Sequence, residues 1–132
     1  MAIWTFSLVP EIKYMRAEIK RIFSLEVKNL PEFVPDNPSD FSIPLRLVLG
    51  PAGEPGEETF DVDVCTPEWL MQHFRGDSVV LLRHKILVNS FDFARIKQFI
   101  ERYVRHCEGD DWNDVAQKLS RLGRWEFEDY RA

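Results

Sequence analysis

The chain has 132 residues, a length typical of one domain with a sizeable hydrophobic core. Its composition, 45% hydrophobic and 30% charged, is ordinary for a globular protein and does not indicate disorder. No apolar run approaches the roughly 20 residues of a membrane-spanning helix, and the apolar N-terminus lacks the basic lead-in and cleavage site of a signal peptide. We therefore expect one domain, residues 1–132, that does not engage a membrane.

Charge is unevenly distributed along this chain, whose net charge is −5. Residues 51–77 hold seven acids and one arginine, a net charge of −6, whereas residues 78–107 hold six bases and two acids, a net charge of +4. The acidic balance argues against nucleic acid as the main partner. It is compatible with docking of a basic protein, whose approach the charge would steer.

The two cysteines, Cys65 and Cys107, lie far apart and lack CxxC spacing. Two reduced thiols are favoured over a disulfide, and this pattern indicates a cytoplasmic protein.

Alternating apolar and polar residues predict strands in the first half of the chain. Residues 15–29 alternate except at Arg21 and Ile22, where a bulge or a helical alternative is indicated. Three prolines in residues 30–40 predict a loop. Residues 41–49 show the most regular alternation in the chain, so they predict the second strand.

A third strand runs directly into a helix in this interpretation. Residues 50–56 are a turn-rich hairpin tip, and residues 57–65 alternate again. Thr66 is suited to cap a helix, Pro67 to its first position and Glu68 to the positive end of its dipole. A short helix should therefore begin at Pro67.

The second half of the chain is predicted to be mostly helical. Residues 79–88 form a fourth strand, with His84 on its apolar side as a hydrogen-bonded core histidine. Asn89 and Ser90 cap a longer helix. Its apolar stripe comprises Phe93, Ile96, Ile100, Tyr103, Val104 and Cys107.

Another helix and a short final strand complete the prediction. Asp110 opens the helix, with Asp111 in its first turn, and Gly123 ends it where a left-handed cap is expected. Residues 124–130 alternate aromatic with acidic side chains and suggest an extended segment packing Trp125 and Phe127. Trp4 is the tryptophan expected to be exposed.

These elements predict an α+β fold. A single antiparallel sheet of about four to five strands, with about three helices packed on one face, satisfies all the patterns. The opposite face of the sheet is then largely exposed to water.

Asp61 and Asp63 are the main candidate site. They lie on one strand face, about 7 Å apart by strand geometry. The favoured interpretation is a solvated face, paired with Arg46 across the hairpin and with Arg83 or Lys85 from the fourth strand. A docking surface is the second interpretation and a divalent metal site the third, because a metal needs more oxygen ligands than these two residues supply.

No catalytic constellation and no cofactor site are predicted. The three histidines are scattered without zinc-ligand spacing, and no GxSxG motif occurs. His106 and Cys107 point about 100° apart on a helix and cannot act as a nucleophile–base pair. The acidic tail, with Glu126, Glu128 and Asp129, is a second candidate docking surface, rated equal to ordinary alternation on a surface strand.

Three stretches together resemble the immunity protein 8 family: FDVDVCTPEWL, LVNSFDFARIKQFIERYV and GDDWNDVAQKLSRLGRWEFEDY. The resemblance covers roughly residues 18–131 and leaves the GPAGEPGE hairpin tip and the N-terminus unmatched. It implies a small α+β antidote encoded beside a bacterial polymorphic toxin, which binds the toxin's effector domain in the cytoplasm. The family has no catalytic residues to transfer.

The expected function is therefore non-enzymatic inhibition of a cognate toxin effector domain, with a nuclease as one candidate toxin. The physical reading places the partner-binding residues at Asp61, Asp63, Glu57, Glu58, Glu126, Glu128 and Asp129. The alternatives are a small metal-dependent hydrolase using Asp61, Asp63 and His84, or a generic regulatory adaptor. The basic helix with Arg95, Lys97, Arg102 and Arg105 is the fallback interface, and a homodimer through an exposed edge strand stays open.

Overall fold

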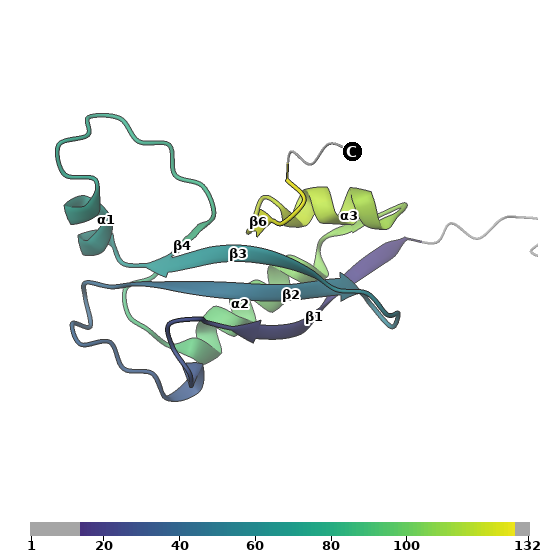
Figure 1. The fold of residues 1–132 in the computed structure, drawn as a ribbon, viewed down its shortest axis with the longest axis horizontal. Coiled ribbons are helices and arrows are strands. Elements are labelled where there is room, and N and C mark those ends of the chain that lie inside the picture. The colour runs from purple at the N-terminus through teal and green to yellow at the C-terminus, as the bar shows by residue number, and fades with distance from the viewer. Residues whose placement is uncertain (1–13, 129–132) are drawn as a thin grey trace, which may run out of the picture.

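The computed structural model describes residues 14–128, which form a curled sheet covered by helices (Figure 1). In chain order the elements are β1 (Met15–Phe23), the 3-10 turn η2 (Leu30–Glu32), β2 (Ser42–Pro51), β3 (Glu58–Cys65), α1 (Pro67–His73), β4 (Lys85–Leu87), α2 (Phe93–Arg105), β5 (Glu108–Gly109), α3 (Trp112–Leu119) and β6 (Arg124–Trp125). The strand order is β4-β3-β2-β1-β5, and β6 also pairs with β3. The α+β prediction is confirmed.

The long antiparallel strands β1, β2 and β3 form the centre of the sheet, as the alternation predicts. Leu45 pairs with Val62 and Leu47 with Phe60, and all four side chains are buried on one face. The register between β1 and β2 shifts between Ile19 and Arg21. The predicted bulge in the first strand is therefore confirmed.

The sheet is mixed and not purely antiparallel, because β4 runs parallel to β3. Asp63 pairs with Lys85 in this ladder, and the amide of Val88 donates to the carbonyl of Cys65 at 2.9 Å. The chain reaches the parallel position by crossing over through α1. The alternation of residues 79–88 carried no information about strand direction.

The predicted strand over residues 79–88 is wrong for residues 79–84. Continued along the register of β4, this segment would lie beside Phe60 and Asp61. That edge of β3 is occupied by β6, whose Trp125 and Arg124 pair with these two residues. Residues 79–83 consequently have no strand to pair with and lie in an exposed loop.

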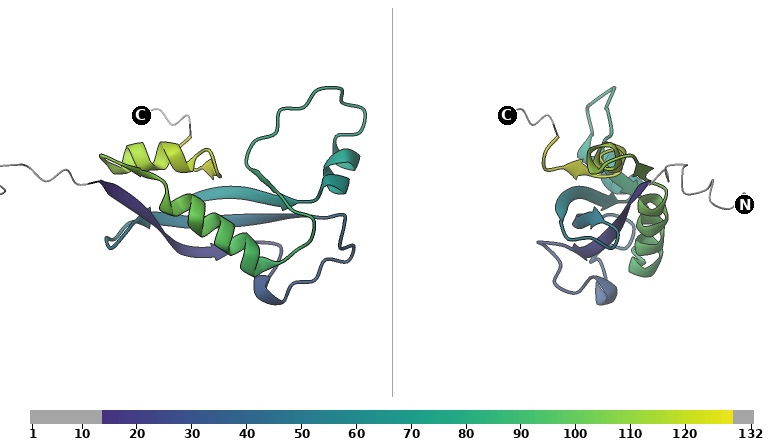
Figure 2. Two further views of the ribbon diagram at one scale, coloured as in Figure 1. Left: turned by 180° about the vertical axis from the view of Figure 1, so that it is seen from behind. Right: turned by 90° about the vertical axis from the view of Figure 1, so that its right-hand side faces the viewer.

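The helices cover the buried face of the sheet unequally. Figure 2 shows α2 lying across the sheet and α3 near its upper edge. Ile96, Ile100 and Val104 of α2 are buried, which confirms the apolar stripe. By contrast, α1 buries none of its residues and lies at the end of β3 (Figure 1).

Helix capping agrees with the sequence at α1 and differs by a few residues elsewhere. The Thr66 hydroxyl accepts a hydrogen bond from the Trp69 amide, as expected, with Pro67 in the first turn. For α2 the cap is Asp92 and not Asn89 or Ser90. Asp111 caps α3, one residue later than predicted, because its carboxylate accepts from the Asp114 amide.

Gly123 does not adopt the left-handed conformation predicted for it; the glycines with positive φ in the described chain are Gly53, Gly56 and Gly76. Glycine suits position 123 because a side chain would be crowded there. A Cβ at position 123 would lie 3.1 Å from the Cβ of Phe60 and 3.3 Å from the Asp61 carbonyl oxygen. The glycine thus lets the chain after α3 approach β3 closely enough for β6 to pair with it.

Trp4 and Asp129 lie outside the described residues. Within residues 14–128, no helix combines the length and the apolar character needed to cross a bilayer.

Candidate partner-binding surface

Asp61 lies on the outer face of β3, directly opposite Arg46 of β2. The Arg46 guanidinium donates from Nε to Asp61 Oδ1 at 2.8 Å and from Nη2 to Oδ2 at 3.0 Å. This two-pronged hydrogen bond with Asp61 raises the pKa of Arg46. The Asp61 side chain is 47% exposed, so the pair remains open to a partner.

Asp63, two residues along β3, faces the same way and is paired by the neighbouring parallel strand. Lys85 Nζ donates to Asp63 Oδ2 at 3.2 Å. The ammonium also lies 5.8 Å from the centroid of the Trp69 ring of α1, within cation–π range. The favoured sequence interpretation, a solvated face with cross-strand ion pairs, therefore describes the observed contacts of both aspartates.

The flanking acids are paired in the same way. Glu57 lies 3.7 Å from Arg21, and Glu128 Oε1 accepts from Arg83 Nη2 at 2.6 Å. This hydrogen bond from Arg83 is the main cause of the lowered pKa of Glu128. The surface is consequently a pattern of alternating charges and not an uncompensated acidic patch.

Glu126 anchors the tail to the sheet. Its carboxylate Oε1 accepts a hydrogen bond from the Thr59 amide at 2.8 Å, and its own amide donates to the Thr59 carbonyl at 3.1 Å. Together with the pairing of β6, these bonds hold the tail beside the first half of β3, which includes Asp61.

Glu58 is turned away from the other predicted site residues. Its carboxylate accepts the indole N–H of Trp112 at 2.9 Å and that of Trp125 at 2.5 Å. The period-2 rule already indicated this orientation, because Glu58 alternates onto the same face as Phe60 and Val62. Glu58 thus joins α3 and β6 to β3.

A hollow of about 480 Å³ opens beside the two aspartates, and Asp61, Asp63 and His84 all line it. The carboxylates of Asp61 and Asp63 accept hydrogen bonds from Arg46 and Lys85. The Nε2 atom of the His84 ring hydrogen-bonds to the carbonyl of Ser120 at 2.7 Å. Residues 14–128 contain no group of three or more His, Cys, Asp or Glu side chains placed to hold a metal ion. The arrangement does not support the hydrolase alternative.

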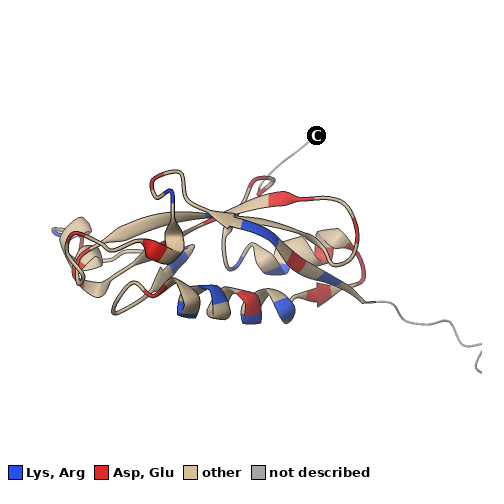
Figure 3. Cartoon of the chain, turned by 90° about the horizontal axis from the view of Figure 1, so that it is seen from below, with Lys and Arg blue, Asp and Glu red and all other residues tan. Residues whose placement is uncertain are grey.

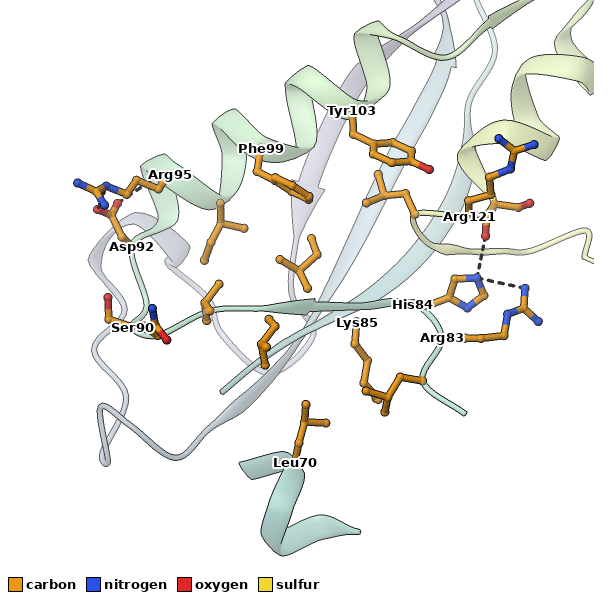
Figure 4. A pocket seen from close by; sticks show the side chains of 18 residues that line it. Leu70, Arg83, His84, Lys85, Ser90, Asp92, Arg95, Phe99, Tyr103 and Arg121 are labelled. Carbon is orange, nitrogen blue, oxygen red and sulfur yellow. Dashed lines mark hydrogen bonds and ion pairs between the residues drawn. The ribbon is translucent and has the colours of Figure 1, made fainter. Parts of the chain in front are cut away.

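A larger groove adjoins this hollow through Arg83 and His84. The sequence did not reveal the cavity, although Arg95 of the fallback interface lines it. It measures about 850 Å³ and lies between β4, α2 and the end of α3 (Figure 4). Leu82, Leu87 and Phe99 line it and are 49%, 59% and 49% exposed. Leu82 is the one residue of the apolar run 79–82 that lines the groove, and strand periodicity assigned that run to a sheet.

A comparison with known protein families identifies the family of this chain. The family model described as immunity protein 8 matches residues 17–130. Searches of curated proteins and of solved structures found nothing similar to the chain. Because the family model covers most of the chain, the protein belongs to the immunity protein 8 family.

Proposed function

We propose that this protein is an immunity protein that binds the effector domain of a cognate polymorphic toxin in the cytoplasm of the producing bacterium and blocks it. The observation that carries the proposal is the family match over residues 17–130. Such inhibition requires a stable scaffold and a complementary surface, and no catalytic group. The effector is proposed to be one encoded beside this gene, with a nuclease as one candidate.

The proposed contact surface is the outer face of β3 with the neighbouring tail. Asp61 and Asp63 are its centre, and Glu57, Glu126 and Glu128 flank them. Asp129, outside the described residues, is kept as a further proposed contact. The exposed fractions of the two aspartates, 47% and 42%, leave their carboxylates accessible. Since bases hold these carboxylates in defined positions, the face presents an ordered charge pattern, which favours specificity over raw affinity. Glu58 has a supporting role here, because it orders α3 and β6.

The test uses the effector domain encoded by the adjacent reading frame. Co-expression with the wild-type protein should restore growth of a host that produces the effector, and the two purified proteins should form a complex. The double substitution Asp61→Asn with Asp63→Asn should weaken the complex about tenfold or more. The matched control, Asp36→Asn with Asp40→Asn, removes the same charge from the loop before β2 and should bind as the wild type does.

Three results would contradict the proposal, the first two the immunity function and the third the proposed surface. Failure of the wild-type protein to bind or neutralise the effector would refute the immunity function, and binding without neutralisation would favour the adaptor alternative. Equal binding by both double variants would refute the proposed surface alone.

Electrostatic steering gives a separate test of this surface. Arg46→Gln removes the base beside Asp61 and makes the face more negative. If a basic effector approaches this face, its association rate should rise in the variant and fall with added salt. An association rate that is independent of salt in both proteins would exclude steering.

A further inference from the structure

Two adjoining hollows, from here on together called the groove, lie along one side of α2. The groove of about 850 Å³ described above meets a second hollow of about 360 Å³, and both are lined by Phe99, Tyr103 and Arg121. Figure 4 shows Phe99 projecting from α2 towards β4 and Tyr103 projecting towards α3, where Arg121 lies. The two hollows thus adjoin at these three side chains.

The charge of this groove is opposite to that of the chain. Its lining includes one acid, Asp92, and six bases: Arg83, Lys85, Arg95, Arg102, Lys118 and Arg121. The protein as a whole has a net charge of −5. Basic residues also recur along α2 (Figure 3), so the groove lies in a basic part of the described chain.

Two of these bases are available for a partner. Arg83, Lys85 and Arg95 already pair with Glu128, Asp63 and Asp92. Arg102 and Arg121, by contrast, have no carboxylate within ion-pair distance among residues 14–128. Both side chains are exposed and border the second hollow.

Apolar side chains lie beside these arginines. Phe99 sits on the α2 wall one turn before Arg102, and Leu87 lies on the facing strand; both are about half exposed. Exposed apolar surface rimmed by charge is typical of protein interaction sites. Leu82 lies at the rim of the groove, in the loop of residues 78–83. No main-chain hydrogen bond joins this loop to any other described segment, so the backbone of the rim is not part of the sheet.

We propose that this groove binds an acidic segment of the effector domain, with carboxylates against Arg102 and Arg121 and an apolar side chain on Phe99 and Leu87. The inference rests on the proposed immunity function. It adds a second contact of opposite charge to the outer face of β3, and the two surfaces meet at Arg83 and His84. A nucleic acid suits the groove less well, because the net charge of −5 repels a polyanion and the walls are partly apolar.

If the effector is a nuclease, it needs a basic cleft for its substrate, and the acidic segment that docks in this groove would lie outside that cleft. The complex would then combine a contact that covers the basic cleft with an anchor away from it.

The decisive experiment compares two charge reversals on the same helix. Arg102→Glu and Arg105→Glu change the charge equally, and both positions lie in the last turn of α2, so their effects on the helix dipole are matched. Arg105 lines neither hollow. The probe is the purified, catalytically inactivated effector domain from the adjacent reading frame, and the readout is its dissociation constant by calorimetry.

Arg102→Glu should weaken binding about tenfold or more, and Phe99→Ala should do likewise, whereas Arg105→Glu should bind as the wild type does. Circular dichroism and thermal unfolding test whether each variant is folded. If Phe99→Ala unfolds, the comparison of Arg102→Glu with Arg105→Glu still decides the question. If the wild type binds and neutralises the effector and Arg102→Glu binds equally well, the groove inference is wrong and the immunity function stands. If the wild type itself does not bind, both fail. Binding of a short labelled single-stranded DNA that Arg102→Glu abolishes would also overturn the inference.

Discussion

Arg46 and Asp61 face each other across β2 and β3 and are joined by two hydrogen bonds of 2.8 and 3.0 Å. Their side chains are 37% and 47% exposed, so water and salt screen the pair. We expect a double-mutant cycle with Arg46→Gln and Asp61→Asn to give a coupling of about 0.5–1 kcal/mol in urea unfolding. The coupling should shrink as salt is added.

The pair Lys97–Glu101 is the matched control for that cycle. It lies on the surface of α2 with 3.9 Å between Nζ and Oε1, and such i,i+4 pairs contribute about 0.3–0.5 kcal/mol. A coupling between Arg46 and Asp61 no larger than this would mean that the two-pronged geometry adds nothing to stability.

Glu58→Ala should destabilise the protein, because it removes the acceptor shared by the Trp112 and Trp125 indoles. Hydrogen bonds to a charged group contribute about 1.5–3 kcal/mol each, and we expect a loss of about 2–4 kcal/mol in the free energy of unfolding. Glu57→Ala is the control, since Glu57 is exposed and lies 3.7 Å from Arg21; it should cost less than about 1 kcal/mol. Equal losses would show that the indole bonds do not stabilise the fold.

Thr66 is the buried polar residue that joins the start of β2 to α1. Its hydroxyl accepts from the amides of Phe41 at 3.2 Å and Trp69 at 3.3 Å. Thr66→Val removes the acceptor at nearly constant volume and leaves the Phe41 amide buried without it, so we expect a loss of about 2 kcal/mol. Thr66→Ser keeps the hydroxyl and should recover most of this stability. Chemical denaturation followed by circular dichroism measures both.

The two thiols, Cys65 and Cys107, are buried, and burial is the main cause of the raised pKa of each. In the native protein they should react with iodoacetamide at about pH 8 at least about a hundredfold more slowly than in denaturant. Because burial raises the folded-state pKa of the thiols, their contribution to the free energy of unfolding is fully present below the unfolded pKa of 9.0. This contribution is lost as the pH rises above that value. Mass spectrometry counts the labels. Rapid labelling of the native protein would contradict the buried positions.

Local patterns were sufficient to predict much of the fold. Period-2 alternation identified the three central strands and their buried side chains, since residues facing one side of a strand recur every second position. The Thr66-Pro67-Glu68 sequence located the start of α1, because helix capping depends on neighbouring residues only. The same alternation places Glu58 on the inward face of its strand. Its two tryptophan partners, however, come from distant parts of the chain.

Only part of the candidate surface could be predicted from local patterns. Arg46 was a predicted partner of Asp61, because a hairpin relates β2 and β3 directly. The choice of Lys85 for Asp63 required the parallel register of β4, which in turn follows a crossover through α1. Likewise Arg83 pairs with Glu128 across a large sequence separation.

The groove along α2 separates what the sequence could predict from what only the tertiary structure decides. An alternating apolar run such as residues 79–88 can form a strand only where another strand offers it hydrogen bonds. Competition for the edge of β3 decided the outcome: β6 takes the positions opposite Phe60 and Asp61, and β4 keeps those from Asp63 to Cys65. Of the residues left outside the strand, Leu82, Arg83 and His84 line an open groove. Pairing is a property of two segments, and only the folded chain brings the competing ones together.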